Sequence, residues 1–195
     1  MLKRIIAFTL VGMLGAASVP AATWNVDRSH SSIDFTVSHL VISKVRGGFG
    51  DFEGTIAFDG KNWEEASTTW TVQVASIDTK DADRDDHLRN PDFFDVEQFP
   101  KMTFVSKKVV NTDGGKFELI GDLTIKDMTK EVTFEGEFRG VIDDPWGKTR
   151  AGFFAETTID RKDFNITWNK TLDAGGLAVG NDVDIRIEVE AVKAD

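Results

Sequence analysis

Apolar and polar residues alternate with a period of two over much of this chain, which restricts its fold more than any other feature. The clearest example lies near the C-terminus, where Val183, Ile185 and Ile187 alternate with Asp184 and Arg186. Shorter segments repeat the pattern, and polar turns separate them. Side chains on a strand point alternately to its two faces. We therefore expect eight or so strands joined by short links, in an antiparallel barrel or a sandwich.

Helix is scarce in this pattern. Only residues 39–45 and 81–89 are compatible with a short helical turn, and neither carries a long apolar stripe. The long segment 159–182 is rich in Gly, Asn and Asp, which predicts an ordered loop before the last strand.

The first 22 residues have the composition of a secretory signal peptide. Lys3 and Arg4 precede an apolar run over 5–17, and small residues follow at 18–22. The run is shorter than the ~20 residues that a spanning helix needs, which argues against a membrane anchor. We therefore expect a signal peptide at 1–22 and one domain at 23–195.

Charge and cysteine content narrow the function classes. Removing Lys3 and Arg4 from the 23 basic side chains leaves 21 against 33 acidic ones, a net charge of −12. Such a surface repels nucleic acid and anionic lipid headgroups. The chain has no cysteine, so neither a disulfide nor a cysteine-linked lipid anchor is available. We expect a protein of the bacterial periplasm, with a homodimer the commonest form if it associates.

The aromatic residues leave two interpretations of the interior. The chain has 15 Phe, 5 Trp and no Tyr. These rings either fill a close-packed core or line a cavity. An eight-stranded barrel is just wide enough to be filled by side chains or to hold one ligand. The alternation is compatible with both.

Histidine spacing argues against a metal centre. The three imidazoles are His30, His39 and His87. Zinc sites take three or four such ligands, but His30 and His39 face opposite ways on a regular strand. His39 falls on the apolar face, where it is either a hydrogen-bonded interior residue or a polar contact in a cavity. We expect no metal and no cofactor.

The densest group of charges in the chain lies at residues 84–89. A solvated, mutually paired helix surface explains Asp85 and Asp86 best, although His87 with either carboxylate also suggests a small hydrolase or isomerase. The chain shows no nucleophile elbow, phosphate-binding loop or zinc-protease helix, so we expect no enzyme. Arg84 stands out because a guanidinium beside an apolar cavity can hold a ligand's polar head.

Several ordered blocks resemble the YceI-like family of bacterial proteins. The most specific are SIDT at 76–79, RDDHL at 84–88, PDFFD at 91–95 and FPKMTF at 99–104. WNVDRSHS at 24–31 opens the match, and DRKDF at 160–164 with Trp168 and Asn169 completes it. Asp127 and Asn165 stand where the family usually has glycine, and both residue types tolerate positive φ.

The resemblance implies an extended, lipocalin-like antiparallel barrel with a long apolar tunnel that holds a polyisoprenoid. The expected ligand is an isoprenoid quinone, a polyprenyl or another long amphiphile, carried in the periplasm without catalysis. We expect polar contacts from His39, Arg84 and His87. The expected apolar wall consists of Phe35, Val37, Trp70, Val72, Phe94, Phe104, Phe134, Phe154 and Trp168. The alternative is a filled barrel that acts as a stress or interaction protein.

Overall fold

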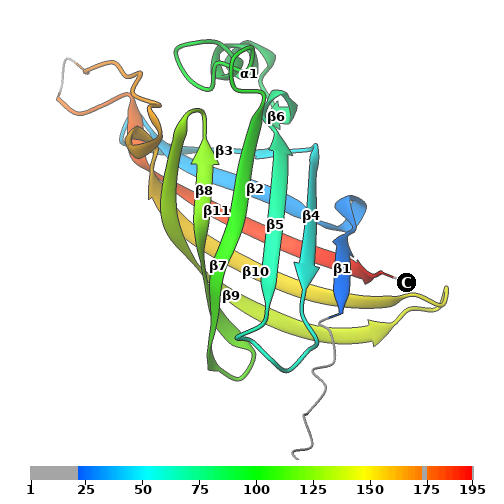
Figure 1. The fold of residues 1–195 in the computed structure, drawn as a ribbon. Helices are drawn as coiled ribbons and strands as arrows, with labels where there is room; N and C mark the ends of the chain where they lie inside the picture. The colour runs from blue at the N-terminus through cyan, green and yellow to red at the C-terminus, as the bar shows by residue number, and fades with distance from the viewer. Residues whose placement is uncertain (1–21, 173–174, 195) are drawn as a thin grey trace, which may run out of the picture.

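The computed structural model describes residues 22–172 and 175–194, and these form an antiparallel β-barrel with a single α-helix (Figure 1). The predicted signal peptide lies outside the described residues, apart from Ala22. The strands are β1 (Thr23–Val26), β2 (Ser32–His39), β3 (Ser43–Phe49), β4 (Phe52–Ala57), β5 (Ser67–Gln73), β6 (Ile77–Asp78), β7 (Lys101–Asp113), β8 (Lys116–Ile125), β9 (Met128–Asp143), β10 (Thr149–Asp160) and β11 (Val179–Lys193).

The eleven strands form a barrel of eight, because three barrel strands are each interrupted once. These are β1 with β2, β3 with β4 and β5 with β6. The 3-10 turn η1 (Arg28–His30) separates β1 from β2, a bend separates β3 from β4, and the 3-10 turn η2 (Val74–Ser76) separates β5 from β6. β11 pairs with β10 along one edge and with both β1 and β2 along the other. The pairings β1–β4, β2–β3, β3–β6, β4–β5 and β5–β7, followed by β7 to β10 in order, complete the ring. The predicted eight-stranded antiparallel barrel is therefore confirmed.

The period-two pattern places apolar side chains inside. On β10, Ala151, Phe153 and Ala155 are buried, while Glu156 is exposed. Phe153 pairs with Val189 of β11, so neighbouring strands present their apolar side chains to the same side of the sheet. Two adjoining clusters of buried side chains run through the interior, one around Phe104 and Phe134 and the other around Trp24 and Phe58.

Helix α1 (Ala82–Arg89) covers one end of the barrel, in the connection between β6 and β7 (Figure 1). Its N-cap is Asp81, whose carboxylate accepts the main-chain N–H of Arg84. The predicted helix at 81–89 is therefore confirmed, with Asp81 as the cap. Within the described ranges, none of the helices has the length and apolar character that crossing a bilayer requires.

The other expected helical turn, at 39–45, is wrong. Instead, a tight turn joins β2 to β3, with positive φ of 51° at Leu40 and 66° at Val41. Seven antiparallel residue pairs, from Ile33 with Phe49 to His39 with Ser43, fix this hairpin. Ladder pairing therefore overrides the local helical preference.

Left-handed backbone occurs at one of the two predicted positions. Asn165, at the end of the 3-10 turn η3 (Arg161–Phe164), has φ of 58°. In the β8–β9 turn the positive φ falls on Lys126, at 55°, one residue before Asp127. The Asn165 side-chain amide donates to the Asp127 carboxylate at 3.1 Å, so these two residues join neighbouring turns.

Candidate functional site

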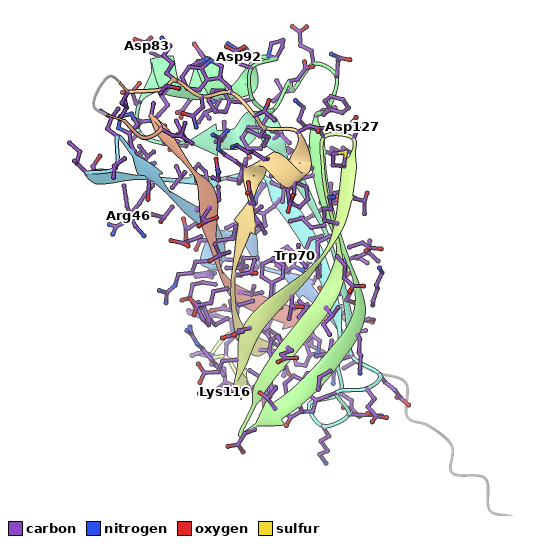
Figure 2. All side chains as sticks on the ribbon, turned by 90° about the vertical axis from the view of Figure 1, so that its left-hand side faces the viewer. Arg46, Trp70, Asp83, Asp92, Lys116 and Asp127 are labelled. Carbon is purple, nitrogen blue, oxygen red and sulfur yellow. The ribbon has the colours of Figure 1, made fainter. Side chains whose placement is uncertain are left out.

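An apolar cavity of about 240 Å³ runs through the interior. Leu88 and Phe93 border it near α1, and Trp63 and Phe117 border it towards the opposite end. Figure 2 shows Trp70 midway along the barrel, between Asp92 near α1 and Lys116 at the other end. The barrel is therefore hollow in part, and the alternative of an interior filled throughout does not describe it.

Several large rings of the interior pack closely against glycines on neighbouring strands. A methyl group on Gly54 would lie 2.7 Å from the Trp70 ring, and one on Gly136 would lie 2.3 Å from the Phe117 ring. In each pair the two residues face each other on neighbouring strands. The rings lie against main chain where a larger residue would push them into the bore. Gly47 with Phe35 repeats the arrangement, and a methyl group on Gly121 would lie 2.5 Å from the Phe104 ring, although the two residues are not directly paired.

Most of the expected wall residues border this cavity. These are Phe35, Val37, Trp70, Val72, Phe94, Phe104 and Phe134. Phe154 also borders it, but its ring lies 4.8 Å from the Arg186 guanidinium and 5.3 Å from that of Arg139. Strand alternation turns Phe153 inward and therefore Phe154 outward, so Phe153 supplies the ring that faces the bore.

Trp168 lies outside the cavity lining, beside the helix. Its ring packs 5.1 Å from the His87 ring and 5.2 Å from the Phe93 ring, so it covers the end of the barrel. Sequence reasoning missed several large wall residues, of which the inward pattern on β3, β8 and β10 would have indicated Phe49, Phe117 and Phe153. Phe58 and Trp63 lie in the β4–β5 connection, where no alternation marks them.

The charged segment fastens α1 to the barrel. Asp85 is 7% exposed and accepts the main-chain N–H of Thr79 at 2.9 Å and its hydroxyl at 2.5 Å. Arg84 donates to the hydroxyl and to the carbonyl of Thr79, at 2.7 and 2.8 Å. Arg84 is not among the residues that border the cavity. Its guanidinium instead donates to Thr79, which lies in the connection that precedes the helix.

His87 and His39 also lie apart from the cavity lining. The His87 imidazole contacts the Asp92 carboxylate at 3.0 Å, and its ring meets Phe93 edge-on. Asp85 bonds to Thr79 instead, so it is not the carboxylate that contacts His87 in the pairing with Asp85 or Asp86 that the hydrolase alternative proposes. The Asp86 carboxylate accepts an N–H from Arg89 at 2.9 Å, so Asp86 also has a partner other than His87.

His39 is half-buried and ends β2, where its carbonyl accepts the Ser43 hydroxyl. The third histidine joins a different group. His30 contacts Asp27 at 3.0 Å, and with Glu190 these ligand atoms lie within 4.8 Å of one another. His30 and His39 therefore do not share a site.

Arg150, at the start of β10, occupies the centre of that acidic group. Its Nη1 donates to Asp27 at 2.8 Å and to Glu190, and its Nε donates to Asp144 at 2.6 Å. Asp144 and Asp27 raise the pKa of Arg150 above its ordinary value. The Ser29 hydroxyl and Arg150 hold the pKa of Asp27 below its usual range. A guanidinium thus bridges two of the three residues with metal-ligand spacing.

Arg161, directly after β10, has a different environment. It is 4% exposed and borders the cavity. Its Nε donates to the Gly180 carbonyl at 2.8 Å, and its Nη1 donates to the carbonyls of Ile166 and Trp168 at 2.6 and 2.9 Å. Burial lowers the pKa of this guanidinium from its ordinary value, against a weaker opposite effect of Asp160.

Sequence reasoning did not select Arg161, although the DRKDF block contains it. Its position immediately after an inward-facing strand was the available signal. None of the carboxylates in the described residues forms an ion pair with it, in contrast to Arg150.

Comparisons with known proteins agree on one family. A sequence model described as "YceI-like domain" matches residues 24–191. A UPF0312 protein of Pectobacterium atrosepticum is 42% identical over 98% of this chain and 97% of its own length. The crystal structure of Burkholderia cenocepacia BcnA superposes with a TM-score of 0.75 at 25% identity, covering 85% of this chain and 98% of BcnA.

A domain of Saccharophagus degradans described as polyisoprenoid binding shares the fold, with a TM-score of 0.68. It is 12% identical, and the match covers 89% of this chain and 99% of that domain.

Proposed function

The chain belongs to the YceI-like domain family, and from that premise we propose that it binds one long-chain amphiphile of the polyisoprenoid type inside its barrel. The apolar cavity is the observation that carries this proposal, because its wall consists almost wholly of aromatic and aliphatic side chains. The shared fold of the Saccharophagus polyisoprenoid-binding domain supports it. An isoprenoid quinone or a polyprenyl chain has an apolar chain of the kind that such a wall would hold.

The cavity volume sets how much of such a chain enters. A 150 Å³ protein cavity holds one benzene ring, so 240 Å³ has room for about ten carbon atoms, or roughly two prenyl units. Burying ten carbon groups contributes about 8 kcal/mol at ~0.8 kcal/mol each, before the entropy of ordering the chain is subtracted. A longer ligand must move wall side chains or extend beyond the barrel.

The proposed role is a carrier or reservoir in the periplasm. The signal-peptide composition of residues 1–22 supports this location. A binding role is favoured over an enzymatic one because Asp85 and Asp86 each bond to partners other than His87.

Lipid extraction from protein purified from its own host tests the proposal directly. We expect native mass spectrometry to show a mass increment that organic solvent removes, and the extract to contain an isoprenoid or similar lipid. Protein that is free of lipid after gentle purification, and that also fails to take up a geraniol probe, would contradict the proposal.

Narrowing the bore gives a second test. Gly54→Ala places a methyl group 2.7 Å from the Trp70 ring and should push that ring into the cavity. A displaced ring takes up bore volume that the ligand would fill, so we expect about tenfold weaker geraniol binding in a fluorescence titration. Gly50→Ala is the matched control, because a methyl group there meets nothing within 4 Å. Equal affinities of the two variants would argue against binding beside Trp70.

A further inference from the structure

Six polar or charged residues are buried in the described part of the chain, and two of them border the cavity, Thr68 and Arg161. The Thr68 hydroxyl already donates to the Thr55 carbonyl and accepts the Trp70 indole N–H, both at 2.8 Å. Its hydrogen-bonding capacity is largely used. Of these two buried side chains, Arg161 is therefore the one that can bind a polar group of a ligand in the cavity.

The hydrogen bonds of Arg161 leave capacity on one nitrogen. A guanidinium has five N–H groups. Three of them form bonds of 2.6–2.9 Å to carbonyls, whereas Nη2 has one long contact of 3.5 Å, to the Val179 carbonyl. Val179 itself borders the cavity. Nη2 is thus the nitrogen with a weak partner, beside a residue of the wall.

Charge favours an anion at this position. Carbonyl dipoles stabilise the Arg161 cation, but a buried charge is costly without an opposite charge. In an apolar cavity an ionic hydrogen bond is stronger than in water. A carboxylate or phosphate also matches the planar donor fork of a guanidinium. A neutral head would leave Arg161 without an ion pair among the described residues.

We propose that Arg161 binds the head group of the ligand and that this head is anionic, a carboxylate or a phosphate ester on an apolar chain. This inference rests on the proposed function, because it assigns the ligand class of the same cavity. The head then lies near η3 and the start of β11, and the chain extends along the bore towards Trp70. This position differs from that of Arg84 and His87, which engage Thr79 and Asp92.

Paired ligands of about ten carbons test the charge preference in the unaltered protein. Decanoate is compared with methyl decanoate, and geranyl phosphate with geraniol, by isothermal titration at pH 7. We expect the anionic member of at least one pair to bind about tenfold more tightly or better, as a charge-assisted hydrogen bond predicts. The two pairs separate a carboxylate source from a phosphate source.

Variants of Arg161 test whether this residue is the source of the preference for anionic ligands. Arg161→Met should remove the anion's advantage while the neutral compounds still bind, and Arg161→Lys should keep part of it. Arg89→Met is the matched control, because Arg89 also donates to main-chain carbonyls, those of Ala75 and Ile77, but does not border the cavity. If Arg161→Met does not fold, the lysine variant and the paired titrations still decide the question.

Equal or tighter binding of both neutral compounds to the unaltered protein would overturn the anionic assignment while leaving the proposed function intact. A charge preference that survives in Arg161→Met would also overturn it, since the preference would then arise elsewhere. If no member of either pair binds, the proposed function itself fails.

Discussion

Two arginines at opposite ends of β10 hold the fold together in different ways. Arg150 begins the strand and contacts three carboxylates, from Asp27, Asp144 and Glu190. Arg161 follows the strand and contacts only main-chain carbonyls among the described residues. Arg150 is therefore the centre of a group of ion pairs, whereas Arg161 is a cation whose partners are the dipoles of main-chain carbonyls.

The difference shows that an arginine's partners determine what it can still do. The bonds of Arg150 join the β9–β10 hairpin to the β1–β2 junction, and its charge is more than balanced. Among the described residues no carboxylate forms an ion pair with Arg161, and Arg161 borders an apolar cavity. Arg150 is thus a structural residue, whereas Arg161 combines a structural role with a capacity for a ligand.

Removing Arg161 should have the largest effect on stability. Arg161→Met leaves the buried carbonyl of Ile166 and the part-buried carbonyls of Gly180 and Trp168 without their donor, and an unpaired buried acceptor costs about 1–3 kcal/mol. We expect the free energy of unfolding to fall by about 3 kcal/mol or more in urea denaturation followed by tryptophan fluorescence. A loss below about 0.5 kcal/mol, the range of ordinary surface substitutions, would contradict this role.

Removing Arg150 should have a smaller effect that depends on pH. The hydrogen bond from Arg150 is the largest cause of the lowered pKa of Asp144. It also contributes to the lowered pKa of Asp27, after the hydrogen bond from Ser29. Carboxylates with a lowered pKa stabilise the folded state above the unfolded pKa of 3.8, and that contribution is lost as pH falls through the folded values. The unaltered protein should therefore lose thermal stability below about pH 4.

Arg150→Met should melt at a lower temperature than the unaltered protein at pH 7, and the difference should shrink as the pH is lowered towards 2. Without the cation, the three neighbouring carboxylates repel one another until they are protonated. Differential scanning calorimetry across this range measures the effect. A difference that is constant with pH would show that packing of the side chain matters more than its charge.

Salt should produce the smallest effect and separate the two arginines further. The Glu190 side chain in the Arg150 group is 36% exposed, so raising the salt concentration to about 1 M should weaken that group by screening. The melting difference between Arg150→Met and the unaltered protein should then decrease. The corresponding difference for Arg161→Met should not change, because its partners are uncharged main-chain carbonyls. Equal salt responses would remove the distinction.

The sequence determined the barrel and most of its inner wall. Alternation alone fixes which side of a strand is apolar, so Phe35, Trp70 and Phe104 were predictable as interior residues. The same rule assigns Phe153 inward and Phe154 outward once the strand's buried face is known. The family blocks predicted a tunnel, and helix α1 followed from the capped, charged segment at 81–89.

The tertiary structure decided which polar residues meet the cavity. Arg84, His87 and Arg161 are all polar residues within family-like blocks, and only the position of Arg161 directly after a strand distinguishes it locally. Their partners come from residues brought near by turns and strand pairing: Thr79 for Arg84, Asp92 for His87 and the start of β11 for Arg161. Strand periodicity is a local property of the backbone, whereas the charge balance of a buried group depends on every element packed around it.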